Sequence, residues 1–361
     1  MQLAPVVPLN VENRLYLPGE NLGGSSPRAA TSTTPSSGSR TRRGAEMTIP
    51  STGLTVPAES EQETAGTTPQ ARGRVLKTLL RDPAAVACAA YIGLIVLMAV
   101  FAPLIVKISG WSPYEFDQSA IDANMGGIPL HGFSREHWLG VEPGTGRDVF
   151  ARIVYGARSS MLIAVSATVL TSVLGVVFGL LAGYFGGRTD MVISRVMEFL
   201  MAFPALIFMI AVLSAMPADN RQYLLVVVIS VFGWPYLARI VRGQTMSLKE
   251  REFVEAAVAS GASRATVVFT EILPNLRSTI LVMVTLAVPG YIGTEAGLSF
   301  LGVGVVPPTP SWGQMISSSV LWYSVVPLYF LVPGVFLALL VLSFMVLGDR
   351  IRAVVDPGGR S

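Results

Sequence analysis

Six stretches of about 18 to 25 mostly apolar residues recur between residue 84 and residue 347. A run of this length crosses the hydrocarbon core of a bilayer as an α-helix. Backbone groups in lipid have no water to pair with, and the runs are too long and too uniformly apolar for barrel strands, so helices are expected. The predicted spans are approximately 84–106, 161–184, 192–216, 223–240, 279–301 and 326–347.

The composition agrees with a membrane protein. Hydrophobic residues make up 51% of the chain and charged residues 14%, whereas about a quarter of a soluble domain is charged. The formal net charge is +3, but the basic residues are scattered and their placement follows topology, so no nucleic-acid partner is expected. We predict an all-α, polytopic integral membrane protein with six transmembrane helices.

Lysine and arginine residues in short flanks orient such a chain, because they favour the cytoplasmic side. Basic residues precede the first span, follow the fourth and follow the sixth: Arg72, Arg74, Lys77, Arg81, Arg242, Lys249, Arg251, Arg264, Arg350 and Arg352. They share one side if both termini are cytoplasmic. The loop 107–160 also carries basic residues, but it is long and partly acid-balanced, so we expect it to be extracytoplasmic. The expected location is the inner (plasma) membrane.

Residues 1–75 are rich in Ser, Thr, Pro, Gly and Arg and have few large apolar residues. Such a segment cannot bury enough surface to offset the entropy of ordering it. We expect a disordered cytoplasmic tail, followed by 76–106 as the segment that leads into and forms the first span. Met47 is an alternative start, and Arg42-Arg43 lacks the apolar region that an export signal requires.

No catalytic residue, metal site or cofactor is expected. The single cysteine, Cys88, lies in an apolar run, which excludes an internal disulfide and a cysteine metal cage. His131 and His137 have no zinc-type spacing, so a solvated loop is predicted for both. The glycine-rich stretch 140–148 lacks the Lys-Ser/Thr pair of a phosphate-binding loop.

Small residues and prolines indicate where the predicted spans contact other helices and where they bend. Gly175, Gly179 and Gly183 are four residues apart, so they form one bare helix face for close contact with another helix, either in this chain or in a partner. Pro204 and Pro289 fall within spans three and five, where a proline bends a helix. Such bends accompany either a gated pathway or ordinary packing.

Few ionisable residues lie inside the predicted spans. Arg195 and Glu198 are three residues apart on one helix face, which favours a mutual ion pair over a place in a pathway. Glu295 is deeper in span five, where it either lines a pathway or bonds a neighbouring helix.

The loop after span four predicts two short helices. A capping-box pattern, Ser247 to Glu250, precedes a small-residue run that ends at Gly261. Residues 263–272 predict a second helix, and Pro274 is expected to end it before span five. A helix that ends in small residues suits the groove of another protein.

The spacing inside this loop is specific. Glu255-Ala256-Ala257, three residues, Gly261, ten residues and then Ile272-Leu273-Pro274 resembles the EAA loop of ATP-binding-cassette (ABC) importer permeases, a coupling element that contacts the ATPase subunit. The resemblance continues through "LKTLLRDPAAVACAAYIGL" (76–94), "HWLGVEPGTGRDVFARIVYGARSS" (137–160), "GTEAGLSFLGVGVVPPTPSWGQM" (293–315) and "VLGDRIRAVVDP" (346–357). The chain is similar to the C-type subunit of the dipeptide/oligopeptide branch. Glu271 departs from that branch, which commonly has His there.

The resemblance implies a non-catalytic permease subunit that forms half of a translocation pathway for di- or oligopeptides or related solutes. Its core would be 161–357, with the coupling loop at about 247–275. The implied partners are a homologous B-type permease subunit, two ATP-binding-cassette ATPases, an extracytoplasmic binding protein and membrane lipid. One alternative is an ion-coupled secondary transporter, for which only Glu198 and Glu295 supply intramembrane acids. The other is a membrane enzyme, for which the histidines are too few.

Overall fold

A computed structural model describes residues 79–355 of the 361-residue chain. The predicted tail, 1–75, lies outside the described residues. The described part is mostly helical and has almost no strands, as expected for this fold class. The helices are α2 (Pro83–Val100), α3 (Ala102–Ser109), α4 (Val149–Phe185), α5 (Gly187–Ala202), α6 (Ala205–Ala215), α7 (Arg221–Lys249), α8 (Glu252–Ala259), α9 (Arg264–Thr266), the π-helix η3 (Val267–Ile272), α10 (Leu273–Phe300), α11 (Trp312–Ser319) and α12 (Pro327–Val355).

Short elements fill the connection between α3 and α4. A 3₁₀ turn, η1 (Gln118–Ala120), precedes the two-residue strand β1 (Ile121–Asp122), and a second, η2 (Ala123–Met125), lies between β1 and its antiparallel partner β2 (Ile128–Pro129). The predicted loop 107–160 is therefore shorter than expected, because α3 ends at Ser109 and α4 begins at Val149. Asp148 caps α4 by accepting a hydrogen bond from the Ala151 amide, which starts this helix well before the apolar run.

Five described helices are long and apolar enough to cross a membrane: α2, α4, α7, the continuous segment from α9 to α10, and α12. The third predicted span is not one straight helix. Its two halves, α5 and α6, meet at an angle of 86°. Phe203 is extended and Pro204 stands at the start of α6, where its missing N–H leaves no bond back to α5. Pro289, by contrast, lies inside α10.

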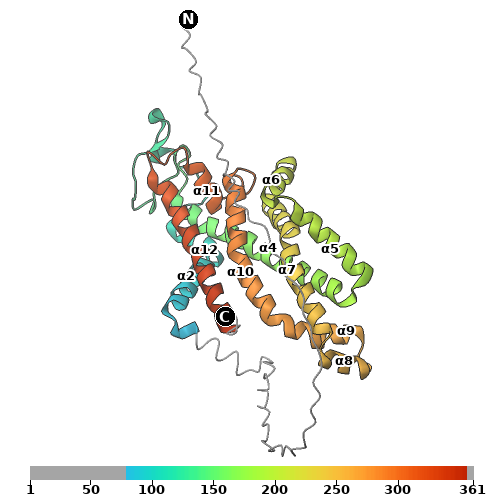
Figure 1. The fold of residues 1–361 in the computed structure, drawn as a ribbon. Helices are drawn as coiled ribbons and strands as arrows, with labels where there is room; N and C mark the ends of the chain where they lie inside the picture. The colour runs from blue at the N-terminus through green and yellow to red at the C-terminus, as the bar shows by residue number, and fades with distance from the viewer. Residues whose placement is uncertain (1–78, 356–361) are drawn as a thin grey trace, which may run out of the picture. The chain divides into compact units, whose positions relative to one another are not determined.

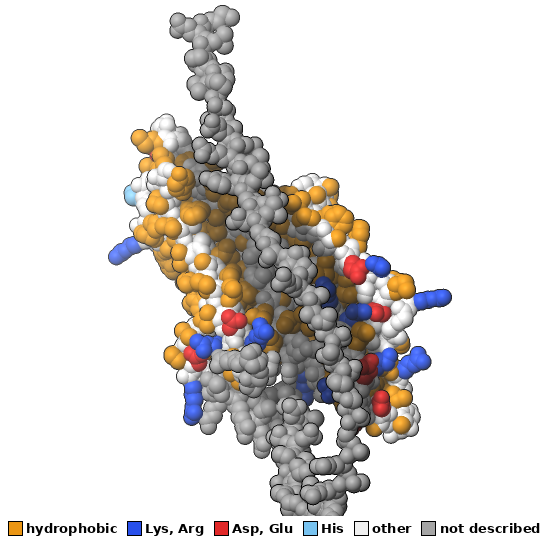
Figure 2. Space-filling view, viewed as in Figure 1, with side chains coloured by type: hydrophobic (Ala, Val, Ile, Leu, Met, Phe, Trp, Pro, Cys, Tyr) orange, Lys and Arg blue, Asp and Glu red, His pale blue; other side chains and the backbone are white. Residues whose placement is uncertain are grey.

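The ends of the helices gather in two groups (Figure 1). The start of α2, the loop that contains α8 and α9, and the end of α12 lie at one end, called here the α8 end. An ion pair of 3.1 Å between Arg350 and Asp82 joins α12 to the start of α2 there. The loop before α4, α6 and α11 lie at the other end, called here the α11 end. Figure 2 shows hydrophobic side chains over much of the visible face, with most charged side chains toward the α8 end.

Helices α4 and α7 make the most extensive helix–helix contact in the described chain, and the glycine face lies between them. A Cβ built on Gly179 would lie 2.8 Å from the carbonyl oxygen of Ala238, and one on Gly183 would lie 2.8 Å from that of Arg242. One turn earlier, a Cβ on Gly175 would lie 2.8 Å from the Cβ of Leu237, a side-chain contact with α7. The bare face therefore contacts a helix of the same chain.

Replacing Gly179 by Ala should destabilise the protein. The added methyl group would overlap the backbone of α7, and overpacking of this kind costs about 1–3 kcal/mol. The matched control is Gly243→Ala in α7, where a Cβ meets no atom within 4 Å; better helix propensity should leave its stability equal or slightly raised. Thermal unfolding in detergent measures both, and equal melting temperatures would contradict the tight contact.

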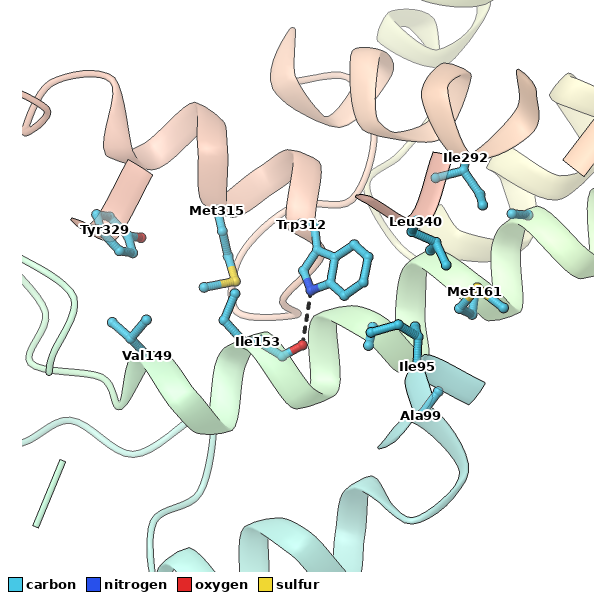
Figure 3. Packing of buried hydrophobic residues seen from close by; sticks show 12 residues of the cluster. Ile95, Ala99, Val149, Ile153, Met161, Ile292, Trp312, Met315, Tyr329 and Leu340 are labelled. Atoms are coloured by element: carbon cyan, nitrogen blue, oxygen red, sulfur yellow. Dashed lines mark hydrogen bonds between the residues drawn. The ribbon is translucent and has the colours of Figure 1, made fainter. Parts of the chain in front are cut away.

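The main core at the α11 end surrounds Trp312 (Figure 3). Its indole N–H donates to the backbone carbonyl of Ile153 at 3.0 Å, and the ring is fully buried. Ile95 and Ala99 of α2, Met161 of α4, Ile292 of α10 and Leu340 of α12 belong to the same cluster. This one side chain therefore fixes α11 against the first turns of α4.

Candidate functional site

A helix-turn-helix segment at the α8 end holds the residues of the predicted coupling loop. Helix α8 ends in a Schellman motif: the Ala262 amide donates to the Ala257 carbonyl, and the Gly261 amide donates to the Val258 carbonyl, both at 3.0 Å. Gly261 has a φ of +84°, in the left-handed region that favours glycine. The chain reverses there and enters α9, which Ser263 caps by accepting from the Thr266 amide.

The predicted capping box at Ser247 is wrong. Helix α7 continues through Lys249, and α8 begins only after Arg251, whose side chain makes no cap bond. The extension is explained by tertiary contacts of the last turns: Thr245 is buried against α4, and the Lys249 ammonium donates to the Tyr184 carbonyl at 2.8 Å. These contacts outweigh the local capping preference.

Pro274 does not end the second short helix, which corrects the expectation from the sequence. The helical segment from Arg264 to Phe300 is continuous. Immediately before the proline, the chain forms the π-helix η3, in which the Leu273 amide donates to the Val268 carbonyl. This local change of register accommodates a residue that has no N–H, and the Asn275 side chain pairs with the Glu271 carbonyl.

One side of this loop is anchored and the other is free in the described chain. Val254, Val267 and Ile272 are buried and belong to a cluster with residues of α4, α7 and α10: Leu180, Tyr184, Leu237, Val241 and Leu276. Glu255, Ala256 and Gly261 are exposed, while Ala257, Leu273 and Pro274 are half-buried. The apolar side chains of Phe253, Val258 and Phe269 are exposed beside them.

A shallow pocket of about 310 Å³ lies where α8 meets the end of α4. Tyr184 and Lys249 form one wall, and Val254, Glu255, Val258 and Ala259 form the other. The Lys249 ammonium also lies 5.6 Å from the centre of the Tyr184 ring. The pocket therefore lies between the loop helix α8 and the ends of α4 and α7, and both polar and apolar groups line it.

The ionisable residues of the predicted spans do not belong to the buried cluster that anchors this loop. Arg195 and Glu198 pair at 2.8 Å on α5, and both are largely exposed. Glu295 is fully buried in α10 and accepts hydrogen bonds from Ser160 of α4 at 2.9 Å and from Ser299 at 2.8 Å. Glu295 therefore joins α4 to α10 and does not face open space.

The sequence interpretation of His137 as a solvated loop residue is wrong. Its side chain is buried, with Nδ1 2.9 Å from a carboxylate oxygen of Asp148 and Nε2 3.2 Å from one of Asp117. Trp111 lies against the ring, with centroids 4.4 Å apart. Hydrogen bonds from Ser119 and then His137 lower the pKa of Asp117. His131 is exposed, as expected.

A second buried polar cluster at the α11 end was not predicted from the sequence, because Tyr329 joins it from α12 and the burial of the other members arises only when the helices pack. Glu142 pairs with Arg147 at 2.6 Å and accepts from the Tyr329 hydroxyl of α12. Arg152, fully buried, lies 3.6 Å from the same carboxylate, an ion-pair distance without a hydrogen bond. Burial raises the pKa of Glu142, but Arg152, the Tyr329 hydroxyl and Arg147 together lower it below its ordinary value.

This lowered pKa predicts an acid-dependent loss of stability. A carboxyl whose pKa is lower in the folded state stabilises the fold above its unfolded value, about 4.3, and loses that contribution as the pH falls through the folded value. The wild-type melting temperature should therefore fall more steeply below about pH 4 than that of Glu142→Gln, which cannot titrate there. Parallel curves for the two proteins would contradict the role of Glu142.

Comparison with known proteins decides the class of this chain. The family described as binding-protein-dependent transport system inner membrane component matches residues 175–361, and the N-terminal TM domain of oligopeptide transport permease C matches 72–126. The chain belongs to this permease family. The oligopeptide transport system permease protein OppC of Bacillus subtilis is 38% identical over 264 residues, which cover 73% of this chain and 82% of that protein.

Other relatives of the permease carry related names. The dipeptide transport system permease protein DppC of Alkalihalophilus pseudofirmus is 36% identical, covering 75% of this chain and 86% of its own. The glutathione transport system permease protein GsiD of Pectobacterium atrosepticum is 34% identical, covering 78% and 89%. A solved structure of the MetNI methionine ABC transporter in an inward-facing conformation is 20% identical, with a TM-score of 0.46, covering 57% of this chain and 97% of that one.

The family matches and the named permease relatives confirm the resemblance to the C-type subunit of the dipeptide/oligopeptide branch. They also favour an ABC importer permease over an ion-coupled secondary transporter. The permease is a multi-pass inner membrane protein. The relatives are transport components, in agreement with a chain whose expected role is not catalytic.

Proposed function

We propose that this permease forms half of the translocation pathway of an ATP-driven importer for di- or oligopeptides or related solutes. The loop 247–275 contacts an ATPase subunit through its exposed face, with Glu255, Ala256 and Ala257 on α8 and Gly261 at the turn. ATP binding and hydrolysis occur in that partner. The permease itself supplies no catalytic residue, metal or cofactor.

The observation that carries this proposal is the two-sided character of the loop. Its inner side is buried against α4, α7 and α10, whereas its outer side leaves small and apolar residues exposed. A loop that served only to connect two spans would not need buried contacts to three membrane helices. A short helix with tiny residues and an acidic side chain at its edge fits a groove in another protein.

The same contacts provide a route for movement. Because the segment from Arg264 to Phe300 is one continuous helix, displacement of the loop moves α10 as a rigid body. Val254 and Lys249 carry the displacement to α4 through their contacts with the region of Tyr184. Closure of two ATPases would in this way tilt the spans between inward-facing and outward-facing states.

The remaining partners follow from the same proposal. A second, homologous permease chain of the B type completes the pathway, since one six-span chain is only half of it. Both termini and the α8 end are cytoplasmic, in agreement with the basic residues of their flanks. An extracytoplasmic binding protein delivers solute to the α11 end, over the segments 110–148 and 301–326.

The solute class is supported by the names of the relatives. They are oligopeptide, dipeptide and glutathione permeases, all of which handle compounds with peptide bonds. We propose a peptide or peptide-like solute. The binding protein would make most of the selection.

Reconstitution in liposomes tests the transport function. The complete complex should accumulate labelled dipeptide only with ATP and binding protein, and the purified chain alone should accumulate none under a proton or sodium gradient. Gradient-driven uptake by the chain alone would overturn the proposal and favour a secondary transporter.

Crosslinking tests the contact itself. In a Cys88→Ser background, Ala256→Cys at the loop should crosslink to the ATPase, whereas Tyr323→Cys, which is exposed at the α11 end, should not. Capture of the ATPase by both variants, or by neither, would contradict the assigned loop contact.

A further inference from the structure

Helix α5 carries a polar face that is largely open in the described chain. Arg195 and Glu198, whose side chains are 78% and 64% exposed, form an ion pair of 2.8 Å on this face. Asp190 and Ser194 continue it toward the start of α5, because positions four residues apart lie on one side of a helix. Arg242 of α7 pairs with Asp190 there, with Nη2 2.7 Å from a carboxylate oxygen. The polar face therefore runs for about 12 Å along α5.

The level of the ion pair in the bundle follows from the helices beside it. Met197, between Arg195 and Glu198 in the sequence, is buried in a cluster with Trp234 and Ala238 of α7, and side chains of α4 pack against the same cluster. Helices α4 and α7 both qualify as membrane spans, and Trp234 is near the middle of the 29-residue helix α7. The ion pair therefore lies level with the middle of a membrane span and not beyond its end.

Another side of α5 is exposed and apolar. Val192, Val196 and Phe199 lie there. Each residue turns an α-helix by about 100°, so Val196 is about 160° around the axis from Glu198. The exposed surface of α5 is thus divided into an apolar part, which suits lipid or an apolar helix, and a charged part, which suits neither.

The charged part needs polar partners from outside the chain. Charged side chains at this level face water or polar groups, because contact with hydrocarbon is costly for them. In the described chain Arg195 donates one hydrogen bond, through Nη1 to Glu198, whereas a guanidinium has five N–H donors. The unused donors and the unused acceptor sites of the carboxylate are complementary to a molecule that carries both a carboxylate and an ammonium group. A free peptide carries these two groups at its ends.

We propose that Arg195 and Glu198 line the water-filled pathway and contact the charged ends of a peptide solute, a role that rests on the proposed function. Arg195 donates two parallel hydrogen bonds to the solute carboxylate, and Glu198 accepts from the solute ammonium group. These contacts replace bonds to water, so they hold the solute only weakly, as passage along a pathway requires. The pair of Asp190 and Arg242 continues the polar wall toward the cytoplasmic side.

Cysteine labelling of the complete complex in lipid nanodiscs tests the contact with water. In a Cys88→Ser background, Glu198→Cys should react with a charged, membrane-impermeant methanethiosulfonate at least about tenfold faster than Val196→Cys, because hydrocarbon excludes the reagent. Equal rates would overturn the proposal. Two fast reactions would mean that α5 lies outside the hydrocarbon, and two slow ones would mean that another chain covers the ion pair.

Uptake by the complete complex in liposomes tests the contact with solute. Arg195→Gln combined with Glu198→Gln removes both charges and leaves neither group without its partner. This double variant should take up labelled dipeptide at least about tenfold more slowly than the wild type, the effect of losing one hydrogen bond to a charged group. Its melting temperature and its amount of assembled complex should be unchanged, since an exposed ion pair contributes little to stability.

Three outcomes of the uptake experiment would contradict the underlying assignments. Wild-type uptake by the double variant would overturn the solute contact and leave the proposed function intact. Slower uptake matched by an equal loss of assembled complex would overturn it as well, because the ion pair would then be structural. Absence of ATP-dependent uptake by the wild type would instead refute the proposed function.

Discussion

Replacing Gly261 by Val should abolish solute-stimulated ATP hydrolysis by the assembled complex while leaving the chain inserted in the membrane. Gly261 has a φ of +84°, which is unfavourable for residues with a Cβ and most of all for β-branched ones. A Cβ built there meets no atom within 4 Å, so the effect would come from backbone conformation and not from a clash. The turn would open and α8 would lose its place beside α4.

The matched control for this prediction is Gly261→Asn. Asparagine tolerates the left-handed region far better than valine, so this variant should retain most of the stimulation. The basal ATPase rate and the amount of assembled complex should be similar for all three proteins. If the Val and Asn variants behaved alike, or if Val left stimulation unchanged, the turn would not position the coupling helix.

The broad architecture was predictable because membrane insertion places a strong constraint on sequence. Long apolar runs require helices, and five such helices with one bent pair are found. Pro204 predicted a bend in the third span, but the angle of 86° between α5 and α6 was not predicted. A proline signals a bend, but its angle depends on what the two halves contact, and most of α5 and α6 is exposed in this chain.

The turn at Gly261 could be predicted from the sequence, but the boundaries of the helices on either side of the loop could not. Gly261 marked the end of α8 because a left-handed turn favours glycine. The predictions from Ser247 and Pro274 were wrong because local preferences, about 1 kcal/mol for a capping residue and about 3 kcal/mol for a proline inside a helix, yield to tertiary contacts and to local changes of helix register. Here the contact of Lys249 with Tyr184 extends α7, and a π-turn accommodates the proline.

The polar clusters of the α11 end were beyond prediction from a single sequence. His137 lies between carboxylates 11 and 20 residues away in the chain, and Arg152 meets an amide oxygen 162 residues away. No periodic pattern connects such positions, since the contacts arise only after the helices pack. The only signal in the sequence was the density of charged residues within 107–160, a segment that was predicted to be a solvated loop.

Arg152→Met should cause the largest loss of stability among single substitutions in this region. The guanidinium is fully buried and donates to the carbonyl oxygens of Pro113 and Pro308, each at 3.3 Å, and to Gln314 Oε1 at 2.8 Å. Methionine fills similar space but leaves these acceptors unpaired and weakens the charge balance of Glu142. Removing one partner of a buried ion pair costs about 3–5 kcal/mol.

The control is Arg158→Met, an exposed arginine on the same helix, which should change the free energy of unfolding by less than about 0.5 kcal/mol. Arg152→Lys should fall between the two, because an ammonium cannot reach three divergent acceptors as a planar guanidinium does. Unfolding in detergent measures all three. Since the acceptors come from two parts of the chain that are far apart in sequence, hydrogen exchange in Arg152→Met should rise around 113 and around 308–314 together, and a rise confined to one of these parts would contradict a shared role.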